Sequence, residues 1–106
     1  MLQEEVIDKI RRYCLLLNDA GIRVEKAFLY GSWARKEGTK ESDIDVMIIS
    51  PDFDNQDMML KAKAWRLTES IDPKIEPYSV GSKKFAHDDV SPLLQVVREE
   101  GLEIKL

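Results

Sequence analysis

A run of β-branched and aliphatic residues that begins with two aspartates constrains the fold of this 106-residue chain most strongly. The run reads Asp43-Ile44-Asp45-Val46-Met47-Ile48-Ile49, and Ser50-Pro51 ends it. Such residues favour strands, and a nearly continuous apolar strand is usually covered on both of its faces. We therefore predict a strand over residues 43–49 in the centre of a sheet, with both aspartates at its start.

The remaining segments predict a small α/β (α+β) fold, with helices packed on a small mixed β-sheet. Apolar residues at helical spacing, with glycine or proline at their ends, predict helices over residues 2–20, 56–71 and 91–101. Shorter apolar or alternating runs predict strands over residues 24–30, 74–80 and 102–106. We expect a short helical segment from Trp33 to about Glu37, a polar loop over residues 81–89, and one minimal domain over residues 1–106.

Composition excludes several classes of protein. The formal net charge of −4 argues against a protein whose main task is to coat nucleic acid. The only cysteine, Cys14, cannot form an internal disulfide and lies on an apolar helical face, so we expect it in the core of a protein kept in a reducing compartment. No stretch is apolar enough to span a membrane, and the amino terminus is too acidic for a signal peptide. We expect a cytoplasmic protein that does not bind a membrane.

The two aspartates predict a metal site. Alternate residues of a strand share a face, so Asp43 and Asp45 would lie roughly 6.5–7 Å apart on the same side. Two like charges at that spacing favour a cation between them, and oxygen ligands favour Mg²⁺ or Mn²⁺. A site with two Mg²⁺ ions generally needs a third carboxylate from a neighbouring strand. Glu76, inside a strand-like run, is our candidate, and Asp72 is the fallback.

A phosphate-binding turn is predicted just before this strand. Gly31 allows a close approach of the backbone, and Ser32 offers a hydroxyl and a main-chain N–H to an anion. Arg35 could bind phosphate or form an ion pair with a nearby acid. Ser42 could contact phosphate or make a local hydrogen bond to the backbone. Together with the carboxylates, this turn predicts phosphoryl or nucleotidyl transfer from a nucleoside triphosphate.

The pattern Gly31-Ser32-x-Ala34-Arg35, followed by Ser42-Asp43-x-Asp45, resembles the minimal nucleotidyltransferases of the DNA polymerase β superfamily. The resemblance implies a polymerase-β-like palm in which Gly31 and Ser32 bind the triphosphate and Asp43 and Asp45 bind Mg²⁺. It also implies that Glu76 activates the acceptor hydroxyl. Two residues depart from the family pattern: Lys36 stands where the family usually has glycine, and the third acid is Glu rather than the commoner Asp.

The same resemblance implies a partner and an acceptor. Members of this size often pair with a small all-helical protein of the HEPN type in toxin–antitoxin modules, and some transfer AMP from ATP to a tyrosine of that partner. We expect such an antitoxin here. The alternatives are a catalytically weak module that neutralises a helical partner by binding alone, and a transferase that modifies a small molecule such as an antibiotic. The sequence leaves the donor base, the acceptor and any homo-oligomer open.

Other conspicuous residues have structural interpretations. Trp33 and Trp65 are expected to pack rather than to stack on bases. The pair Lys83-Lys84 is expected on a solvated surface, with contact to an acidic partner as the alternative. The region of Met58, Met59 and Trp65, or the amino-terminal helix, could supply an interface.

Overall fold

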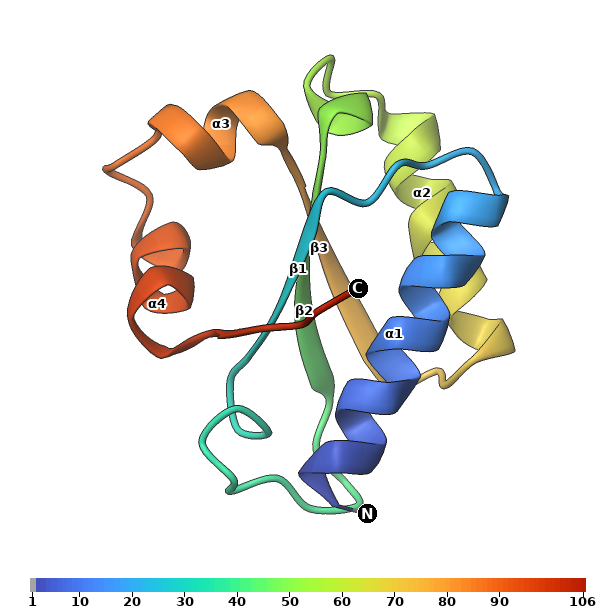
Figure 1. Cartoon of the computed structure of the whole chain (residues 1–106), viewed down its shortest axis with the longest axis vertical. Coiled ribbons are helices and arrows are strands. Elements are labelled where there is room, and N and C mark those ends of the chain that lie inside the picture. Colours follow the sequence, from blue (N-terminus) through green and yellow to red (C-terminus); the bar gives the residue numbers. More distant parts are fainter. Residues whose placement is uncertain (1) are drawn as a thin grey trace.

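The computed structural model describes residues 2–106 and has three layers, with helices on both faces of a four-stranded sheet (Figure 1). In chain order the elements are α1 (Gln3–Asp19), β1 (Lys26–Tyr30), β2 (Ile44–Ser50), η1 (Pro51–Phe53), α2 (Met58–Leu67), η2 (Thr68–Ser70), β3 (Ile75–Gly81), α3 (Ser82–His87), α4 (Pro92–Glu100) and β4 (Leu102–Glu103). The prediction of a small α+β fold with a mixed sheet is confirmed.

The strand that begins beside the two aspartates, β2, lies inside the sheet, as predicted. The strand order is β3-β2-β1-β4, with β1 antiparallel to both β2 and β4, and β2 parallel to β3. A parallel pair needs a crossover connection, and α2 provides it between β2 and β3. This leaves β3 at one edge of the sheet, where Pro77 is tolerated because an edge strand needs fewer N–H donors.

Alternation along β2 divides the apolar residues between two cores. Ile44, Val46 and Ile48 point to the face covered by α1 and α2, where most of the buried residues gather. Met47 and Ile49 point to the other face, covered by α3 and α4, and pack in a smaller core with Val80, Leu94 and Val97. Figure 1 shows the two helical layers on opposite sides of the sheet. Burial on both faces explains why β2 lacks the polar alternation of a surface strand.

The predicted loop over residues 81–89 is wrong, because α3 occupies Ser82–His87. This helix has no buried residue of its own, so no helical periodicity marks it in the sequence. Phe85 anchors it to the sheet, with its ring centroid 5.3 Å from that of Phe28 on β1. The guanidinium of Arg98 on α4 lies 5.4 Å from the centroid of the same ring. Tertiary packing, rather than local pattern, therefore accounts for this helix.

The predicted helical segment from Trp33 to Glu37 is also wrong, because residues 32–36 form turns. Lys36 has φ = 61°, a left-handed conformation that a right-handed helix cannot contain. Trp33 is only 4% exposed and packs against Gly38, which confirms its expected structural role. The buried ring holds the turn against the end of the sheet.

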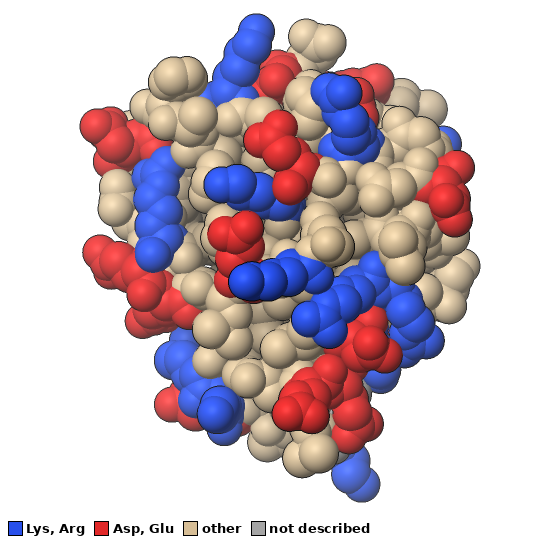
Figure 2. Space-filling view, in the orientation of Figure 1, with Lys and Arg blue, Asp and Glu red and all other residues tan. Residues whose placement is uncertain are grey.

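The surface in the orientation of Figure 1 carries interspersed acidic and basic side chains, with no extended area of a single sign (Figure 2). Within residues 2–106, none of the helices has the length and apolar character needed to cross a membrane.

Candidate active site

The three predicted acidic residues lie at the start of the two parallel strands. Asp43 immediately precedes β2, Asp45 is the second residue of β2, and Glu76 is the second residue of β3. Asp45 pairs directly with Glu76 in the parallel register. Paired residues of adjacent strands project to the same face, so these two carboxylates lie side by side, on strands about 4.8 Å apart. The structure therefore brings together Asp45 and Glu76, which are 31 positions apart in the sequence.

Shifts in pKa show that these carboxylates act on one another. Loss of solvation raises the pKa of Glu76 first, and the charge of Asp43, a hydrogen bond with Asp43 and the charge of Asp45 raise it further. The pKa of Asp45 is also raised, by burial and then by the charge of Asp43, although Arg35 partly opposes this. Negative charge thus accumulates at this end of the sheet, and a bound cation would relieve the repulsion.

The donor set fits Mg²⁺, although the carboxylates do not close around an ion by themselves. Among residues 2–106, no group of three or more His, Cys, Asp or Glu side chains already has the arrangement of a metal site. Mg²⁺ normally keeps several waters and takes further ligands from substrate phosphates, so an open set of carboxylates suffices. Asp43, Asp45 and Glu76 present only hard oxygen donors, which favour Mg²⁺ over Zn²⁺.

Gly31 lies directly against one of these carboxylates. Its φ is +76°, and a Cβ added here would collide with the Asp45 carboxylate. The Gly31 carbonyl accepts hydrogen bonds from the N–H groups of Ala34 at 3.1 Å and Arg35 at 3.3 Å, which closes a tight turn. Two independent reasons therefore favour glycine at this position: the positive φ, and the lack of room for a Cβ beside Asp45. The predicted phosphate-binding turn adjoins the carboxylates.

The other candidate phosphate ligands have local partners. Arg35 Nε donates to Glu37 Oε2 at 2.9 Å, and Arg35 Nη1 lies 3.8 Å from a carboxylate oxygen of Glu100. Ser42 Oγ accepts a hydrogen bond from the N–H of Thr39 at 3.0 Å. Both alternatives to phosphate binding are therefore present: an ion pair for Arg35 and a hydrogen bond to the backbone for Ser42. Phosphate binding by these two residues stays a prediction. Ser32 is half-buried, and its carbonyl accepts from the N–H of Glu37 at 2.9 Å.

The departure from the family pattern at Lys36 has a conformational meaning. This residue is one of two non-glycine residues with positive φ within residues 2–106. A glycine adopts such a conformation without steric cost, whereas a side chain is strained there. The turn that follows Gly31 therefore keeps a backbone shape suited to glycine although the residue is lysine.

Asp72, the fallback third acid, has a structural role instead. Its carboxylate forms an ion pair with Lys9 on α1 and accepts the N–H of Lys74 at 2.8 Å. Burial opposes ionisation of Asp72, but the contacts with Lys9 and Lys74 outweigh it and lower the pKa. Asp72 thus ties the start of β3 to α1, and Glu76 is the better candidate for the site.

Two tyrosines beside the carboxylates were not predicted. Tyr30 on β1 is opposite Asp45 in the antiparallel register, and burial, followed by the charges of Asp45, Tyr78 and Glu76, raises its pKa to about 12. Tyr78 follows Glu76 by two residues on the same face of β3 and is 46% exposed. Period-two alternation in residues 74–80 could have identified Tyr78, but Tyr30 required the strand register. The two phenol groups flank the carboxylates on the sheet.

The comparisons with known proteins agree with this geometry. Residues 7–101 match the family profile described as the nucleotidyltransferase domain. No curated protein is similar enough in sequence to count as a match. One similar crystal structure is of a protein from Sulfolobus solfataricus assigned as a nucleotidyltransferase, with 12% identity, a TM-score of 0.65, and coverage of 95% of this chain and 80% of that one.

A second similar crystal structure is described as a toxin–antitoxin with AMP-PNP. It is 20% identical, has a TM-score of 0.65, and the match covers 93% of this chain and 72% of that one. At these identities the two structures establish the shared fold, while the profile match spans nearly the whole chain. The chain therefore belongs to the nucleotidyltransferase domain family.

Proposed function

We propose that this nucleotidyltransferase transfers AMP from ATP to a tyrosine hydroxyl of a small helical partner toxin of the HEPN type, with Mg²⁺ as cofactor, and so acts as an antitoxin. The observation that carries this proposal is the convergence of Asp43, Asp45 and Glu76 beside the Gly31 turn. The similar structure that contains a toxin–antitoxin and AMP-PNP supports an adenine nucleotide and a protein partner.

Each group at the site has a role in this reaction. The Gly31-Ser32 turn binds the triphosphate through its main-chain N–H groups, and Gly31 brings the turn against the Asp45 carboxylate. Asp43 and Asp45 would hold Mg²⁺, with Glu76 as the third ligand. Bound there, Mg²⁺ would supply Lewis-acid polarisation of the α-phosphate and neutralisation of charge on the leaving pyrophosphate.

Glu76 is the proposed base. It accepts the proton of the acceptor hydroxyl as that oxygen bonds to the α-phosphorus and the bond from this phosphorus to the α–β bridging oxygen breaks. Because Glu76 is exposed on the edge strand, a side chain from another protein can reach it.

The test uses two labelled forms of ATP. The purified chain, Mg²⁺ and a small helical protein encoded beside it are incubated with ATP labelled on the α- or the γ-phosphate. We expect label on the partner only from the α-labelled form, since nucleotidyl transfer releases the γ-phosphate with pyrophosphate. Asp43→Asn and Asp45→Asn should each reduce labelling at least about a hundredfold, as losses of transition-state charge stabilisation do. Asp19→Asn, which removes an exposed carboxylate of α1, is the matched control and should label normally.

Other outcomes identify the rival functions. Labelling from the γ-labelled form would show phosphoryl transfer and contradict the proposal. Neutralisation of the partner without labelling, unchanged by both Asn variants, would indicate a binding module. Transfer to a small acceptor without any protein partner would indicate a small-molecule transferase.

A further inference from the structure

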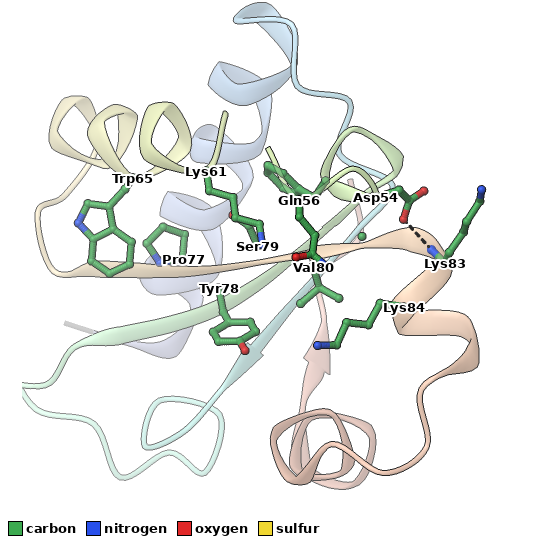
Figure 3. Close-up of a pocket in the computed structure, with 12 residues that line it drawn as sticks. Asp54, Gln56, Lys61, Trp65, Pro77, Tyr78, Ser79, Val80, Lys83 and Lys84 are labelled. Carbon is green, nitrogen blue, oxygen red and sulfur yellow. Dashed lines mark hydrogen bonds between the residues drawn. The ribbon is translucent and has the colours of Figure 1, made fainter. Parts of the chain in front are cut away.

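A groove of about 410 Å³ follows the free edge of β3, beside α2 and the start of α3 (Figure 3). Lys61 and Trp65 line it from α2, Pro77 and Tyr78 from β3, and Lys83 and Lys84 from α3. None of these lysines belongs to the carboxylate site described above. The groove therefore needs its own explanation.

The backbone of β3 presents hydrogen-bonding groups to this groove. The N–H of Ile44 donates to the carbonyl of Lys74 at 2.8 Å. The main-chain groups of residue 74 therefore point toward β2. Because every second residue of a strand directs its N–H and carbonyl to the same side, residues 76, 78 and 80 also direct theirs toward β2. Pro77 and Ser79 then direct their main-chain groups away from β2, and β3 has no other strand beside it. The Ser79 N–H and carbonyl are available to an added strand, and Pro77 loses no hydrogen bond of the sheet.

The charge of the groove is positive in a chain of net negative charge. Its charged lining consists of Lys61, Lys83 and Lys84 against the single acid Asp54. One oxygen of Asp54 already accepts the N–H of Lys83 at 2.9 Å, drawn as the dashed line in Figure 3. Because the whole chain carries −4, this local excess of lysine favours an acidic ligand.

The groove adjoins the candidate active site through Tyr78. Tyr78 lines the groove and shares a face with Glu76, two residues away and roughly 6.6 Å along the strand. A segment that pairs with β3 would therefore pass next to Glu76.

We propose that an acidic, extended segment of a partner protein binds in this groove as an added strand on β3, and that it carries the acceptor tyrosine to Glu76. The second clause rests on the proposed function, whereas the docking itself does not. A strand supplies alternating N–H and carbonyl groups that match the free edge, and its acidic side chains reach the lysines on both sides. Single-stranded nucleic acid lacks that backbone pattern.

The binding test omits ATP and Mg²⁺. The probe is a fluorescently labelled random copolymer of glutamate and tyrosine, followed by anisotropy, with a lysine–tyrosine copolymer and oligothymidylate as comparison ligands. We expect binding of the acidic copolymer only. The double variant Lys61→Glu/Lys84→Glu should weaken it about tenfold or more, since the ion pairs of two groove lysines are lost and become repulsive. Lys26→Glu/Lys105→Glu, which reverses two exposed lysines outside the groove, is the matched control and should bind normally.

A second pair of variants tests strand addition itself. Ser79→Pro removes the outward N–H and should weaken the probe several-fold, whereas Ser79→Ala keeps that N–H and should bind like the wild type. Melting temperatures verify that both variants fold.

Three results would overturn the docking proposal: equal binding by the groove and control double variants, stronger binding of oligothymidylate, or equal binding by the two Ser79 variants. Asp45→Asn should still bind the acidic copolymer in the anisotropy assay but should no longer transfer AMP to the partner in the labelling assay. This difference separates the two proposals. Binding without any transfer by the wild type would overturn the proposed function and leave the groove as an interaction site.

Discussion

Gly31 and Asp45 occupy adjoining space, and this contact controls where the carboxylate can lie. In Gly31→Ala the new Cβ would collide with the Asp45 carboxylate, and φ = +76° would be strained. We expect about 1–2 kcal/mol of lost stability. Nucleotidyl transfer should fall by more than the lower fraction of folded protein explains, because the added Cβ displaces the Asp45 carboxylate. Melting curves and labelling by α-labelled ATP measure both effects.

Gly21 supplies the matched control. Its φ is +91°, yet a Cβ added there meets nothing within 4 Å. Gly21→Ala should therefore show the backbone strain alone, with a similar loss of stability and normal transfer. Equal transfer by the two alanine variants would contradict the proposed dependence of Asp45 on Gly31.

Lys36 is held in a backbone conformation that favours glycine. Its φ of 61° disfavours any side chain, so Lys36→Gly should raise the free energy of unfolding by roughly 0.5–1 kcal/mol. Lys36→Ala removes the same charge but keeps the Cβ, and it should give no comparable gain. Denaturant unfolding of the three proteins measures the difference. A glycine variant no more stable than the alanine variant would show that the turn is not strained at this residue.

At the scale of the elements, the start of β2 holds Asp43 and a partly buried Asp45 close together, at a cost to stability. The pKa of Asp45 is raised from the ordinary value of 3.8 by burial and by Asp43. The folded state therefore binds this proton more tightly than the unfolded state does, and the ionised form destabilises the fold above the raised pKa. Without Mg²⁺, Asp45→Asn should be more stable than the wild type near neutral pH, with a higher melting temperature.

The sign of the pH dependence distinguishes this effect from ordinary acid denaturation. As the pH falls through the raised pKa, wild-type Asp45 becomes neutral, so the advantage of Asp45→Asn should shrink. Added Mg²⁺ with a non-hydrolysable ATP analogue should stabilise the wild type and leave the variant nearly unchanged. A constant difference in melting temperature at all pH values, with no response to Mg²⁺, would contradict the interpretation. Asp19→Asn again controls for the loss of one carboxylate.

At the scale of the whole molecule, the two cores are unequal, and the face of the sheet that carries Asp45 and Glu76 has the smaller one. The main core joins α1, α2 and the sheet, whereas α3 contributes no fully buried residue and α4 contributes Leu94 and Val97. Regions with few buried apolar contacts open at a lower free energy than the main core. We therefore expect amide hydrogens in residues 82–100 to exchange faster than those in α1 and β2. Hydrogen exchange followed by mass spectrometry tests this, and equal protection of both layers would contradict it.

The parts predicted from sequence are those with a local cause. The apolar run of β2 predicted a central strand because burial on both faces removes polar alternation, and the periodicity of α1 predicted its position to within a residue at each end. The helix α3 was missed because a single half-buried side chain, Phe85, holds it in place. The sequence predicts a helix over the turn after Gly31 because no residue pattern there indicates the positive φ of Lys36.

The sequence by itself determined which residues form the nucleotidyltransferase-like motif: Gly31, Ser32, Asp43 and Asp45. The motif depends only on residue types and their spacing along the chain. The sequence also indicated Glu76 as an acid inside a strand. Only the tertiary structure decided that Glu76 and Asp45 are register partners, and that Tyr30 and Tyr78 flank them. The physical reason is that strand pairing joins distant residues through hydrogen bonds of the backbone, which are the same for every residue type. The free edge of β3 and its lysine-lined groove have the same origin, because an edge exists only once the strand order is known.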